Sequence, residues 1–456
     1  MKRDTQRQLF LLFGDLIIIL LSINLAYLVR KNILVDIDIL SERIVPIVFQ
    51  VVVYLIGFYI FNLYNIRLNF RSIRFFSLLV GAFVFISLCT IMFFYVFPYR
   101  LGLGRGLFII SLVSTGVLIT TWRLFYYILF RIALPPKRVL IIGTGPAADD
   151  VYTLIAKNPD YEIIGFVAGT NNGKNPNSNK KILGDSLSLE YIAKERQVDS
   201  IVITINPARN KQLKQSLVAC KLRGINIYDI PQFYEFLLEK LPISYIKEEW
   251  FIYSDGFNYI GNKIYGRFKR VVDLTLSAIF LVLALPLFIL ISIIIKVSSK
   301  GPIFFSQERL GENFQPFMLY KFRTMIADAE QDGPQWAEKD DPRVTKTGKL
   351  LRQVRLDELP QLLNIIKGEM SFIGPRPERE FFIKSLMEKI PYYSLRLSAK
   401  PGLTGWAQVK FRYGASEKDA VEKLQYDLFY IKNMSLFLDF RIVLKTITVV
   451  LFGMGR

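Results

Sequence analysis

Four long apolar stretches fill the first 134 residues and limit how this part of the chain can fold. They cover residues 9–28, 44–61, 75–97 and 107–130. Each approaches or exceeds the roughly 20 residues that a helix needs to span a bilayer. No small-residue cleavage signature follows the first stretch, so we interpret it as a retained anchor rather than a signal peptide. The sequence therefore predicts an α-helical bundle of four membrane spans over residues 1–134.

Basic residues are distributed unevenly over the segments between these stretches. The N-terminus, the loop after the second stretch and the segment after the fourth carry Lys2, Arg3, Arg7, Arg67, Arg71, Arg74, Arg131, Lys137 and Arg138. The opposite loops carry Arg30, Lys31 and Arg43 beside three acidic residues, and Arg100 and Arg105. Because cytoplasmic loops are enriched in lysine and arginine, we expect the N-terminus and everything after the fourth span in the cytoplasm.

The composition of the 456-residue chain limits the classes of partner that it can bind and the kinds of catalysis that it can perform. Lysine and arginine number 58 against 39 aspartates and glutamates, a net charge of +19, which favours an anionic partner. No nucleic-acid-binding module accompanies this charge, so a phospholipid surface or a phosphorylated substrate fits better. The chain has no histidine, which excludes Ser-His-Asp and Cys-His catalysis. Any transfer chemistry must therefore use carboxylates, lysine, tyrosine or a divalent metal held by oxygen ligands.

A predicted Rossmann-like α/β domain covers residues 135–235. A buried-strand pattern runs into the turn Gly143-x-Gly145-x-x-Ala148 and then into a helical pattern. Three further strand-like segments alternate with helical patterns and cover residues 162–167, 200–205 and 226–230. The second strand ends without the acidic residue that would hold a ribose. Two interpretations therefore stay open: a degenerate or regulatory domain, and a domain that binds a nucleotide cofactor.

Residues 236–262 are expected to form a linker. Near its end, Tyr259 and Lys263 have the Tyr-x-x-x-Lys spacing of short-chain oxidoreductases. In those enzymes the two residues share a helical face, whereas Gly261 and Asn262 argue against a helix here. We interpret this spacing as a coincidence.

A fifth apolar stretch, residues 271–295, lies at the start of the C-terminal region 263–456. Pro286 falls in its second half and removes a hydrogen bond from a helical backbone. Both ends are flanked by basic residues, namely Lys263, Arg267, Lys269 and Arg270 before it and Lys296 and Lys300 after it. We expect a re-entrant helix, kinked at Pro286, with both ends in the cytoplasm. An ordinary spanning helix is the alternative.

Residues 352–377 bring acidic and basic groups together. Asp357 and Glu358 lie between Arg352 and Arg355 on one side and Arg376 on the other. The apolar run that follows the two carboxylates predicts a short helix ending at Lys367-Gly368. Asp357 would then lie at the helix N-terminus, where free N–H groups favour a charged carboxylate. The plainer interpretation is a helix cap with surface ion pairs.

Two segments supply further groups for an anion. Pro375 and Pro377 fix the backbone around Arg376, as a rigid phosphate clamp requires. Lys321 and Arg323 alternate on one face of a predicted strand and could converge on a phosphate, although an exposed edge strand would show the same pattern.

Several C-terminal segments have the pattern of helices at a bilayer interface. Residues 381–389 predict an amphipathic helix, and the aromatic and basic run 391–396 suits the interface itself. Turn-forming residues 400–409 display Thr404 and Trp406. Residues 435–452 predict a helix lying on the membrane.

With these residues in hand, the chain resembles the bacterial polyprenyl-phosphate hexose-1-phosphate transferases. These are the large monotopic phosphoglycosyl transferases that prime exopolysaccharide or O-antigen synthesis. The resemblance rests on Lys-Phe-Arg-Thr-Met at 321–325, Asp-Glu-Leu-Pro-Gln-Leu at 357–362, Gly-Glu-Met-Ser-Phe-Ile-Gly-Pro-Arg-Pro at 368–377 and Lys-Pro-Gly-Leu-Thr-Gly-Trp-Ala-Gln-Val at 400–409.

The resemblance implies roles for the residues in these motifs. Asp357 would be the nucleophile and Glu358 its partner, with Mg²⁺ held by the two carboxylates. Arg376 would lie near the nucleotide diphosphate. The remaining substrate or phosphate positions implied are Lys321, Arg323, Arg352, Pro375, Pro377, Thr404 and Gln408. After Val409 many members continue Asn-Gly or Ser-Gly, whereas this chain has Lys410-Phe-Arg-Tyr-Gly414, which leaves the identity of the sugar open.

The implied reaction moves a sugar-1-phosphate from a UDP-sugar to polyprenyl (undecaprenyl) phosphate and releases UMP, through a phosphosugar-aspartate intermediate. The enzyme would lie in the bacterial inner membrane as a homodimer, with its Rossmann-like and catalytic domains in the cytoplasm. Two other hypotheses stay open: a membrane-anchored NAD-dependent nucleotide-sugar epimerase or dehydratase, and a non-catalytic scaffold of polysaccharide assembly.

Overall fold

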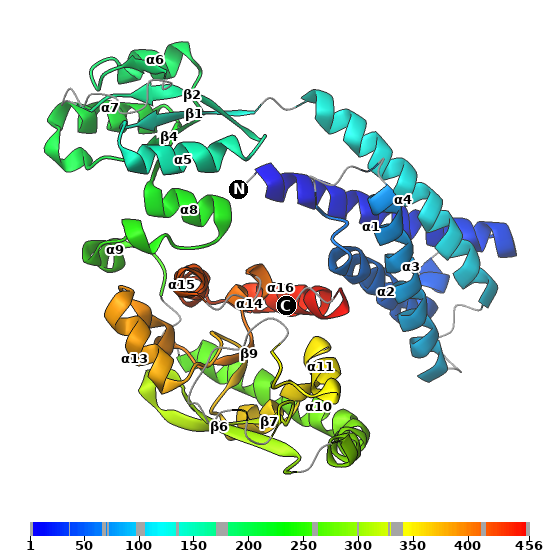
Figure 1. Cartoon of the computed structure of the whole chain (residues 1–456). Helices are drawn as coiled ribbons and strands as arrows, with labels where there is room; N and C mark the ends of the chain where they lie inside the picture. Colours follow the sequence, from blue (N-terminus) through cyan, green and yellow to red (C-terminus); the bar gives the residue numbers. More distant parts are fainter. Residues whose placement is uncertain are drawn as a thin grey trace. The chain divides into compact units, whose positions relative to one another are not determined.

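The computed structural model (Figure 1) describes residues 3–35, 37–65, 70, 73–96, 105–133, 136–169, 181–257, 263–298, 301–326, 329, 341–411 and 416–452. The chain divides into two compact units, Met1–Leu134 and Pro135–Arg456. Among the residues discussed above, Lys2, Arg67, Arg71, Arg100, Tyr259, Gly261, Asn262, Lys300, Arg412, Tyr413 and Gly414 lie outside the described residues.

The first unit consists of long apolar helices, drawn from blue to cyan in Figure 1. α1 packs against α4 and α2 packs against α3. In α2 the backbone leaves helical geometry at Arg43 (φ −116°, ψ 16°), in the turn before Pro46, where the proline ring crowds the helix. The helices are α1 (Arg3–Lys31), α2 (Ile37–Ile60), α3 (Ile73–Val96) and α4 (Arg105–Ala133).

Long apolar helices in this protein leave much of their surface uncovered by protein. Among the described residues, five helices are long and apolar enough to cross a membrane: α1 to α4 and α10 (Lys263–Ser298). Outward-facing side chains such as Val80, Leu88 and Met92 are 63%, 63% and 69% exposed. Exposed apolar surface of this extent is expected where lipid, not water, is the solvent.

The interior of the first unit contains a charged pair. Arg123 Nη2 donates to Asp15 Oδ2 at 2.6 Å, and both side chains are fully buried. The guanidinium also lies over the rings of Tyr64 and Phe70, 5.3 and 5.8 Å from their centroids. Ionisable groups among apolar helices are costly unless paired, so this contact fixes how α1 meets α4.

The second unit begins with a five-stranded parallel sheet in the order β3-β2-β1-β4-β5. This doubly wound order confirms the predicted α/β architecture. The short strand β3 was not predicted, because three residues carry too little pattern. The strands are β1 (Lys137–Ile142), β2 (Tyr161–Val167), β3 (Ile182–Gly184), β4 (Ser200–Ile203) and β5 (Asn226–Asp229).

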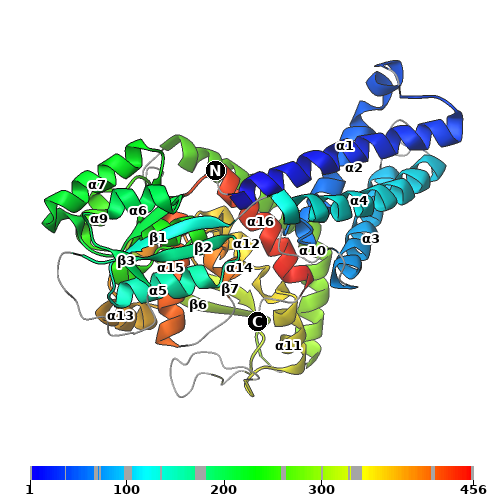
Figure 2. The ribbon, with the colours of Figure 1, turned by 90° about the horizontal axis from the view of Figure 1, so that it is seen from above.

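Helices cover both faces of this sheet (Figure 2). Val139 and Ile141 of β1 point toward α5 and α8, whereas Leu140 and Ile142 point toward α6 and α7. Alternate residues of a buried strand face opposite sides, which explains why β1 is apolar throughout. The helices are α5 (Pro146–Ala156), α6 (Leu189–Glu195), η1 (Pro207–Arg209), α7 (Lys211–Leu222), α8 (Ile230–Leu238), η2 (Ile243–Tyr245) and α9 (Glu248–Tyr253).

After α10 the chain forms short strands and helices around one large core and two smaller ones. β6 and β7 pair antiparallel, and β8 and β9 pair parallel. The elements are β6 (Phe304–Leu310), η3 (Glu312–Phe314), β7 (Pro316–Phe322), α11 (Lys346–Gln353), η4 (Leu356–Glu358), α12 (Gln361–Lys367), β8 (Ser371–Ile373), α13 (Glu380–Lys389), η5 (Tyr393–Ser398), β9 (Gly402–Thr404), α14 (Trp406–Lys410), α15 (Glu417–Lys432) and α16 (Leu436–Leu451). α12 ends at Gly368, whose φ of 90° suits the predicted helix end.

Helix α10 continues through Pro286 as one helix. The helical assignment is continuous at this proline, and the kink and the re-entrant course expected for α10 stay predictions. Apolar helices tolerate proline where neighbouring groups satisfy the freed carbonyl.

Two residues of the run 391–396, Tyr393 and Arg396, do not lie on the surface as the pattern suggested, whereas Pro391 is exposed. Tyr393 is 3% and Arg396 is 5% exposed, and Tyr393 belongs to the largest core cluster of the second unit. Arg396 is buried because Asp427 accepts its Nη2 at 2.9 Å and Tyr393 accepts its Nη1 at 2.8 Å. The interfacial interpretation of these two residues is wrong. Phe437 and Phe440 of α16, in contrast, are 72% and 53% exposed.

Candidate active site

The two adjacent carboxylates lie in a short, buried helical turn of the second unit. Asp357 and Glu358 belong to η4, which Leu359 and Pro360 connect to α12, and are 6% and 7% exposed. Arg355, which precedes this turn, has a left-handed backbone (φ 57°, ψ 22°), a conformation that costs a non-glycine residue about 1 kcal/mol. Burial of both carboxylates contradicts the plainer interpretation of a cap with surface ion pairs.

Glu358 is the carboxylate that holds the basic side chains. Its Oε1 accepts Arg376 Nη2 at 2.6 Å and Lys321 Nζ at 3.3 Å. Burial acts to raise the pKa of Glu358, but Arg376 and Lys321 together outweigh it and hold the pKa well below its usual range. Glu358 therefore stays ionised at neutral pH.

Asp357 differs electrostatically from its neighbour. Burial raises its pKa, and the charge of Glu358 raises it further, against the opposing effect of Lys321, Arg352 and Arg376. A carboxylate with a raised pKa is more basic and binds an electrophile more strongly. The dyad thus contains one firmly ionised group and one more basic group.

The segment 374–377, Gly-Pro-Arg-Pro, forms a strap that carries Arg376 to the dyad. It follows β8, which pairs with β9. A Cβ on Gly374 would lie 2.1 Å from the carbonyl oxygen of Lys400, and one on Gly405 would lie 2.1 Å from that of Gly374. These approaches require glycine. Arg396 Nη2 also donates to the carbonyl of Arg376 at 3.0 Å, so the buried Arg396 anchors the strap.

For the remaining predicted site residues, the contacts that the structure shows are with groups other than the dyad. Arg352 Nε donates to Thr324 Oγ1 at 2.8 Å. Arg323 is 7% exposed and its guanidinium fills the space beside Gly301. The Thr404 hydroxyl pairs with that of Thr446 on α16 at 2.7 Å. Both polar atoms of the Gln408 amide are buried and have no hydrogen-bond partner among the described residues.

Three polar residues near the start of α10 contact both sides of the site. Lys269 Nζ donates to the carbonyl of Ile373, the residue before the strap, at 2.9 Å. Arg270 donates to the carbonyls of Ile365 and Ile366 at the end of α12, the latter at 2.6 Å. Asp273 accepts the N–H of Phe372 at 3.1 Å. α10 thus holds the ends of both segments that carry the dyad and Arg376.

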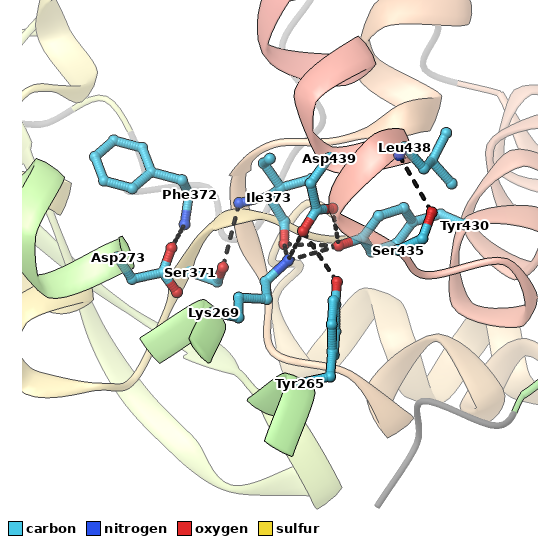
Figure 3. Close-up of polar contacts among 10 residues, drawn as sticks. All are labelled: Tyr265, Lys269, Asp273, Ser371, Phe372, Ile373, Tyr430, Ser435, Leu438 and Asp439. Atoms are coloured by element: carbon cyan, nitrogen blue, oxygen red, sulfur yellow. Dashed lines mark hydrogen bonds and ion pairs between the residues drawn. The ribbon is translucent and has the colours of Figure 1, made fainter. Parts of the chain in front are cut away.

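Figure 3 shows the network in which Lys269 lies. Its ammonium also contacts Asp439 Oδ2 at 3.0 Å and Tyr430 Oη at 2.7 Å. Tyr265 and Tyr430 donate to the two oxygens of Asp439, at 2.9 and 2.8 Å. In the sequence Lys269 and Arg270 were noted only as flanking charges. The sequence feature that could have identified these residues as structural contacts is the close spacing of Lys269, Arg270 and Asp273 at one end of an otherwise apolar helix.

We expect Lys269→Met to lower turnover about ten- to hundredfold, because a small displacement of the strap would move Arg376 away from Glu358. The measurement is the rate of the reaction catalysed at this site, compared between membranes that contain equal amounts of folded protein. Lys384→Met removes a lysine that is 72% exposed on α13 and provides the control. Equal rates for the two variants would show that Lys269 does not position the strap.

Glu358→Gln should lower the stability of the second unit by about 2 kcal/mol at neutral pH. The value lies below the 3 kcal/mol or more typical of buried pairs, because the side chain of Arg376 is 41% exposed. Since the pKa of Glu358 is depressed, its contribution is present above the unfolded value of about 4.3 and is lost as the pH falls. Thermal unfolding of both proteins over a pH series should therefore converge in acid. A constant difference would contradict this assignment.

The dyad suits one hard divalent cation. Among the described residues, no group of three or more aspartate, glutamate or cysteine side chains is arranged to hold a metal. Mg²⁺, however, is commonly bound by one or two carboxylates together with substrate phosphates. Asp357 and Glu358 fit that donor set.

Two protein families match this chain. A family described as bacterial sugar transferase matches residues 264–453, and one described as CoA-binding domain matches residues 59–231. The UDP-N-acetylgalactosamine-undecaprenyl-phosphate N-acetylgalactosaminephosphotransferase of Aeromonas hydrophila is 41% identical over 239 residues, covering 52% of this chain and 55% of that protein. The chain thus spans about half the length of this relative.

Other relatives extend the match toward the N-terminus. The UDP-glucose:undecaprenyl-phosphate glucose-1-phosphate transferase of Klebsiella pneumoniae is 31% identical over 323 residues, covering 70% of this chain and 68% of that protein. The undecaprenyl-phosphate glucose phosphotransferase of Komagataeibacter xylinus is 29% identical over 394 residues, covering 80% of this chain and 69% of that protein. Together with its five long apolar helices and its buried carboxylate dyad, these matches place this membrane protein in the family of bacterial polyprenyl-phosphate sugar-1-phosphate transferases.

Proposed function

We propose that the protein transfers a sugar-1-phosphate from a UDP-sugar to polyprenyl (undecaprenyl) phosphate, releasing UMP and forming a polyprenyl-diphosphate sugar. This would be the priming step of exopolysaccharide or O-antigen synthesis. The observation that carries the proposal is the buried dyad, in which Arg376 and Lys321 hold Glu358 beside the more basic Asp357. The names of the relatives, which specify undecaprenyl phosphate and glucose or N-acetylgalactosamine, support it.

In this mechanism Asp357 is the nucleophile. One of its carboxylate oxygens attacks the phosphorus bonded to the sugar, and the phosphoanhydride bond to UMP breaks, with the electron pair leaving on UMP. The lipid phosphate then attacks the same phosphorus and restores the carboxylate of Asp357. Neither step needs a histidine. Splitting the transfer also avoids bringing two multiply charged substrates directly together.

The other residues bind and orient the phosphates. Arg376 and Lys321 would stabilise oxygens of the transferred phosphoryl group, with Glu358 keeping both cations in place. Arg352, Arg323, Thr404, Gln408 and the rigid prolines Pro375 and Pro377 are assigned to the substrate pocket. The unpaired amide of Gln408 supports a ligand contact there. Mg²⁺ bound by Asp357 and Glu358 would neutralise charge on the diphosphate.

The proposal places catalysis in residues 263–456 on the cytoplasmic face of the bacterial inner membrane, in a homodimer. The Rossmann-like domain, 135–235, and the linker, 236–262, would lie on the same side, after a four-span region, 1–134. α10 would be re-entrant. Support comes from contacts at both of its ends, since Lys269 and Arg270 hold β8 and α12, while Ile291 and Ile295 pack against Phe322 and Leu351 of the same unit.

The direct test is UMP release by the full-length protein in membranes. The assay would use a panel of UDP-sugars with undecaprenyl phosphate, with and without Mg²⁺ chelation. We expect UMP for one sugar or a few, dependent on the lipid phosphate for multiple turnovers. If no UDP-sugar yields UMP while bound NAD copurifies, the epimerase or dehydratase hypothesis replaces this one.

A further inference from the structure

A buried asparagine on α12 contacts the backbone of β7, the strand that carries Lys321. Asn364 is 0% exposed, and both polar atoms of its side-chain amide have partners. Its Oδ1 accepts the backbone N–H of Tyr320 at 3.1 Å. Its Nδ2 donates to the carbonyl of Met318 at 2.6 Å and to Glu369 Oε2 at 2.7 Å. One side chain thus binds two backbone groups of β7.

These two backbone groups lie on the free edge of β7. Among the described residues, β7 pairs with β6 and with no other strand. In an antiparallel pair, alternate residues turn their N–H and C=O groups away from the partner strand. Met318 and Tyr320 are alternate residues of β7, and Pro316, the residue before them in this series, has no N–H. The Asn364 amide therefore takes the place that a peptide group of a third strand would occupy.

Lys321 follows Tyr320 directly and contacts the dyad. Its Nζ lies 3.3 Å from Glu358 Oε1, and 21% of its side chain is exposed. This distance is already at the long end of the range for a hydrogen bond, so a displacement of roughly 1 Å would break the contact. The position of β7 relative to α12 therefore decides whether Lys321 reaches Glu358.

Asn364 has little freedom to move relative to the dyad. Its backbone carbonyl accepts the N–H groups of Gly368, Glu369 and Met370, at 3.1, 3.1 and 3.3 Å. α12 is seven residues long and is joined to η4 by only two residues. The amide of Asn364 is therefore a fixed reference point for β7.

The apolar contacts between β7 and α12 are less specific. Phe317 and Leu319 pack in one cluster with Leu362 and Ile365. Apolar contacts are non-directional and permit small sliding movements, whereas a pair of hydrogen bonds depends on distance and angle. The two bonds from Asn364 can therefore set the register of β7 more sharply than the cluster does.

We propose that Asn364 is a positioning residue, which pairs with the free edge of β7 and so holds Lys321 against Glu358, where its ammonium meets the transferred phosphoryl group. Asn364 would act through Lys321 and not on the substrate. This inference rests on the proposed function, in which Lys321 stabilises that phosphoryl group.

The test is a double-mutant cycle between Asn364 and Lys321, measured as UMP release by the full-length protein in membranes with equal amounts of folded protein. Asn364→Ala should lower the rate about tenfold in the wild-type background. In the Lys321→Met background it should lower the rate less than about twofold, because the lysine that it positions is already gone. Equal factors in the two backgrounds would show a general loss of packing and overturn the proposal.

Lys367→Met is the matched control on the same helix. Lys367 is exposed, and its Nζ donates to the hydroxyl of Tyr320 at 3.0 Å. The variant thus removes a contact between α12 and the same residue of β7, but leaves the backbone of β7 paired. Its rate should stay within about twofold of wild type. A loss as large as that of Asn364→Ala would contradict the assignment.

Asn364→Asp gives a second test that does not require the alanine variant to fold. It keeps the shape and the acceptor for Tyr320, but an ionised carboxylate cannot donate to the carbonyl of Met318. A protonated carboxyl regains one donor, and burial beside Glu369 favours protonation. Its rate relative to wild type should therefore rise as the pH is lowered from about 8 to about 6. A ratio that does not change with pH would overturn the proposal.

Hydrogen exchange of the Tyr320 amide is a readout that does not depend on activity. Asn364→Ala removes the acceptor of this N–H and should speed its exchange about tenfold or more, whereas Lys367→Met should not. Unchanged exchange in Asn364→Ala would overturn this inference even if the reaction is confirmed. If the wild-type protein releases no UMP from any UDP-sugar, the proposed function fails, and the exchange rates still show whether Asn364 holds β7.

Discussion

Asp357→Asn should reduce UMP release by a factor of about 10,000 or more while leaving a folded membrane protein, because a carboxamide cannot form the covalent intermediate. Burial raises the pKa of Asp357, so its charged form is disfavoured in the folded state. A neutral residue of the same shape should therefore leave thermal stability at neutral pH unchanged or slightly increased. The measurements are UMP release and thermal unfolding of the same membrane preparation.

The matched control changes a carboxylate outside the site. Glu380→Gln on α13 removes a side chain that is 45% exposed and pairs with Lys384, and it should keep full activity. Trapping with a labelled UDP-sugar should place the label on Asp357 in the wild-type protein and nowhere in the asparagine variant. Turnover by Asp357→Asn at a rate near that of the control would remove Asp357 from the nucleophilic role.

Arg123→Leu should destabilise the first unit by about 3 kcal/mol, because it leaves Asp15 buried without its partner. Unfolding of the membrane-embedded protein by a denaturing detergent would measure this loss. The effect should be confined to the N-terminal unit, so turnover per folded molecule provides a second readout.

The double variant Asp15→Leu/Arg123→Leu separates an unpaired charge from lost packing. It removes both charges, and we expect it to recover most of the stability lost by Arg123→Leu alone. If the double variant is as unstable as the single one, the loss comes from the packing of Arg123 on Tyr64 and Phe70.

Local patterns were sufficient to predict most of the helices and the sheet. Apolar length indicated α1 to α4 and α10, and the strand and helix alternation after residue 135 indicated a parallel sheet. The run after Glu358 predicted α12 and its end at Gly368. These features depend on residues a few positions apart, which a sequence shows directly.

Long-range partners could not be predicted. The sequence around Tyr393 and Arg396 would look the same whether these residues lay in a core or at a bilayer interface. Only Asp427, 31 residues beyond Arg396, explains why they are buried. Lys269 was noted as a flanking charge because its partner Asp439 is 170 residues away. At the dyad, the sequence indicated a rigid arginine, but not that Arg376 contacts Glu358 rather than Asp357.

The attachment of α10 to both β8 and α12 has a consequence for which lipids can react. With the carbonyl of Ile373 and those at the end of α12 tied to adjacent residues of one apolar helix, the reacting carboxylate should keep a constant height relative to the bilayer. The enzyme would then distinguish lipid acceptors by how far their phosphate headgroups project from the bilayer. Shortening or lengthening the polyprenyl tail should change the rate of transfer little.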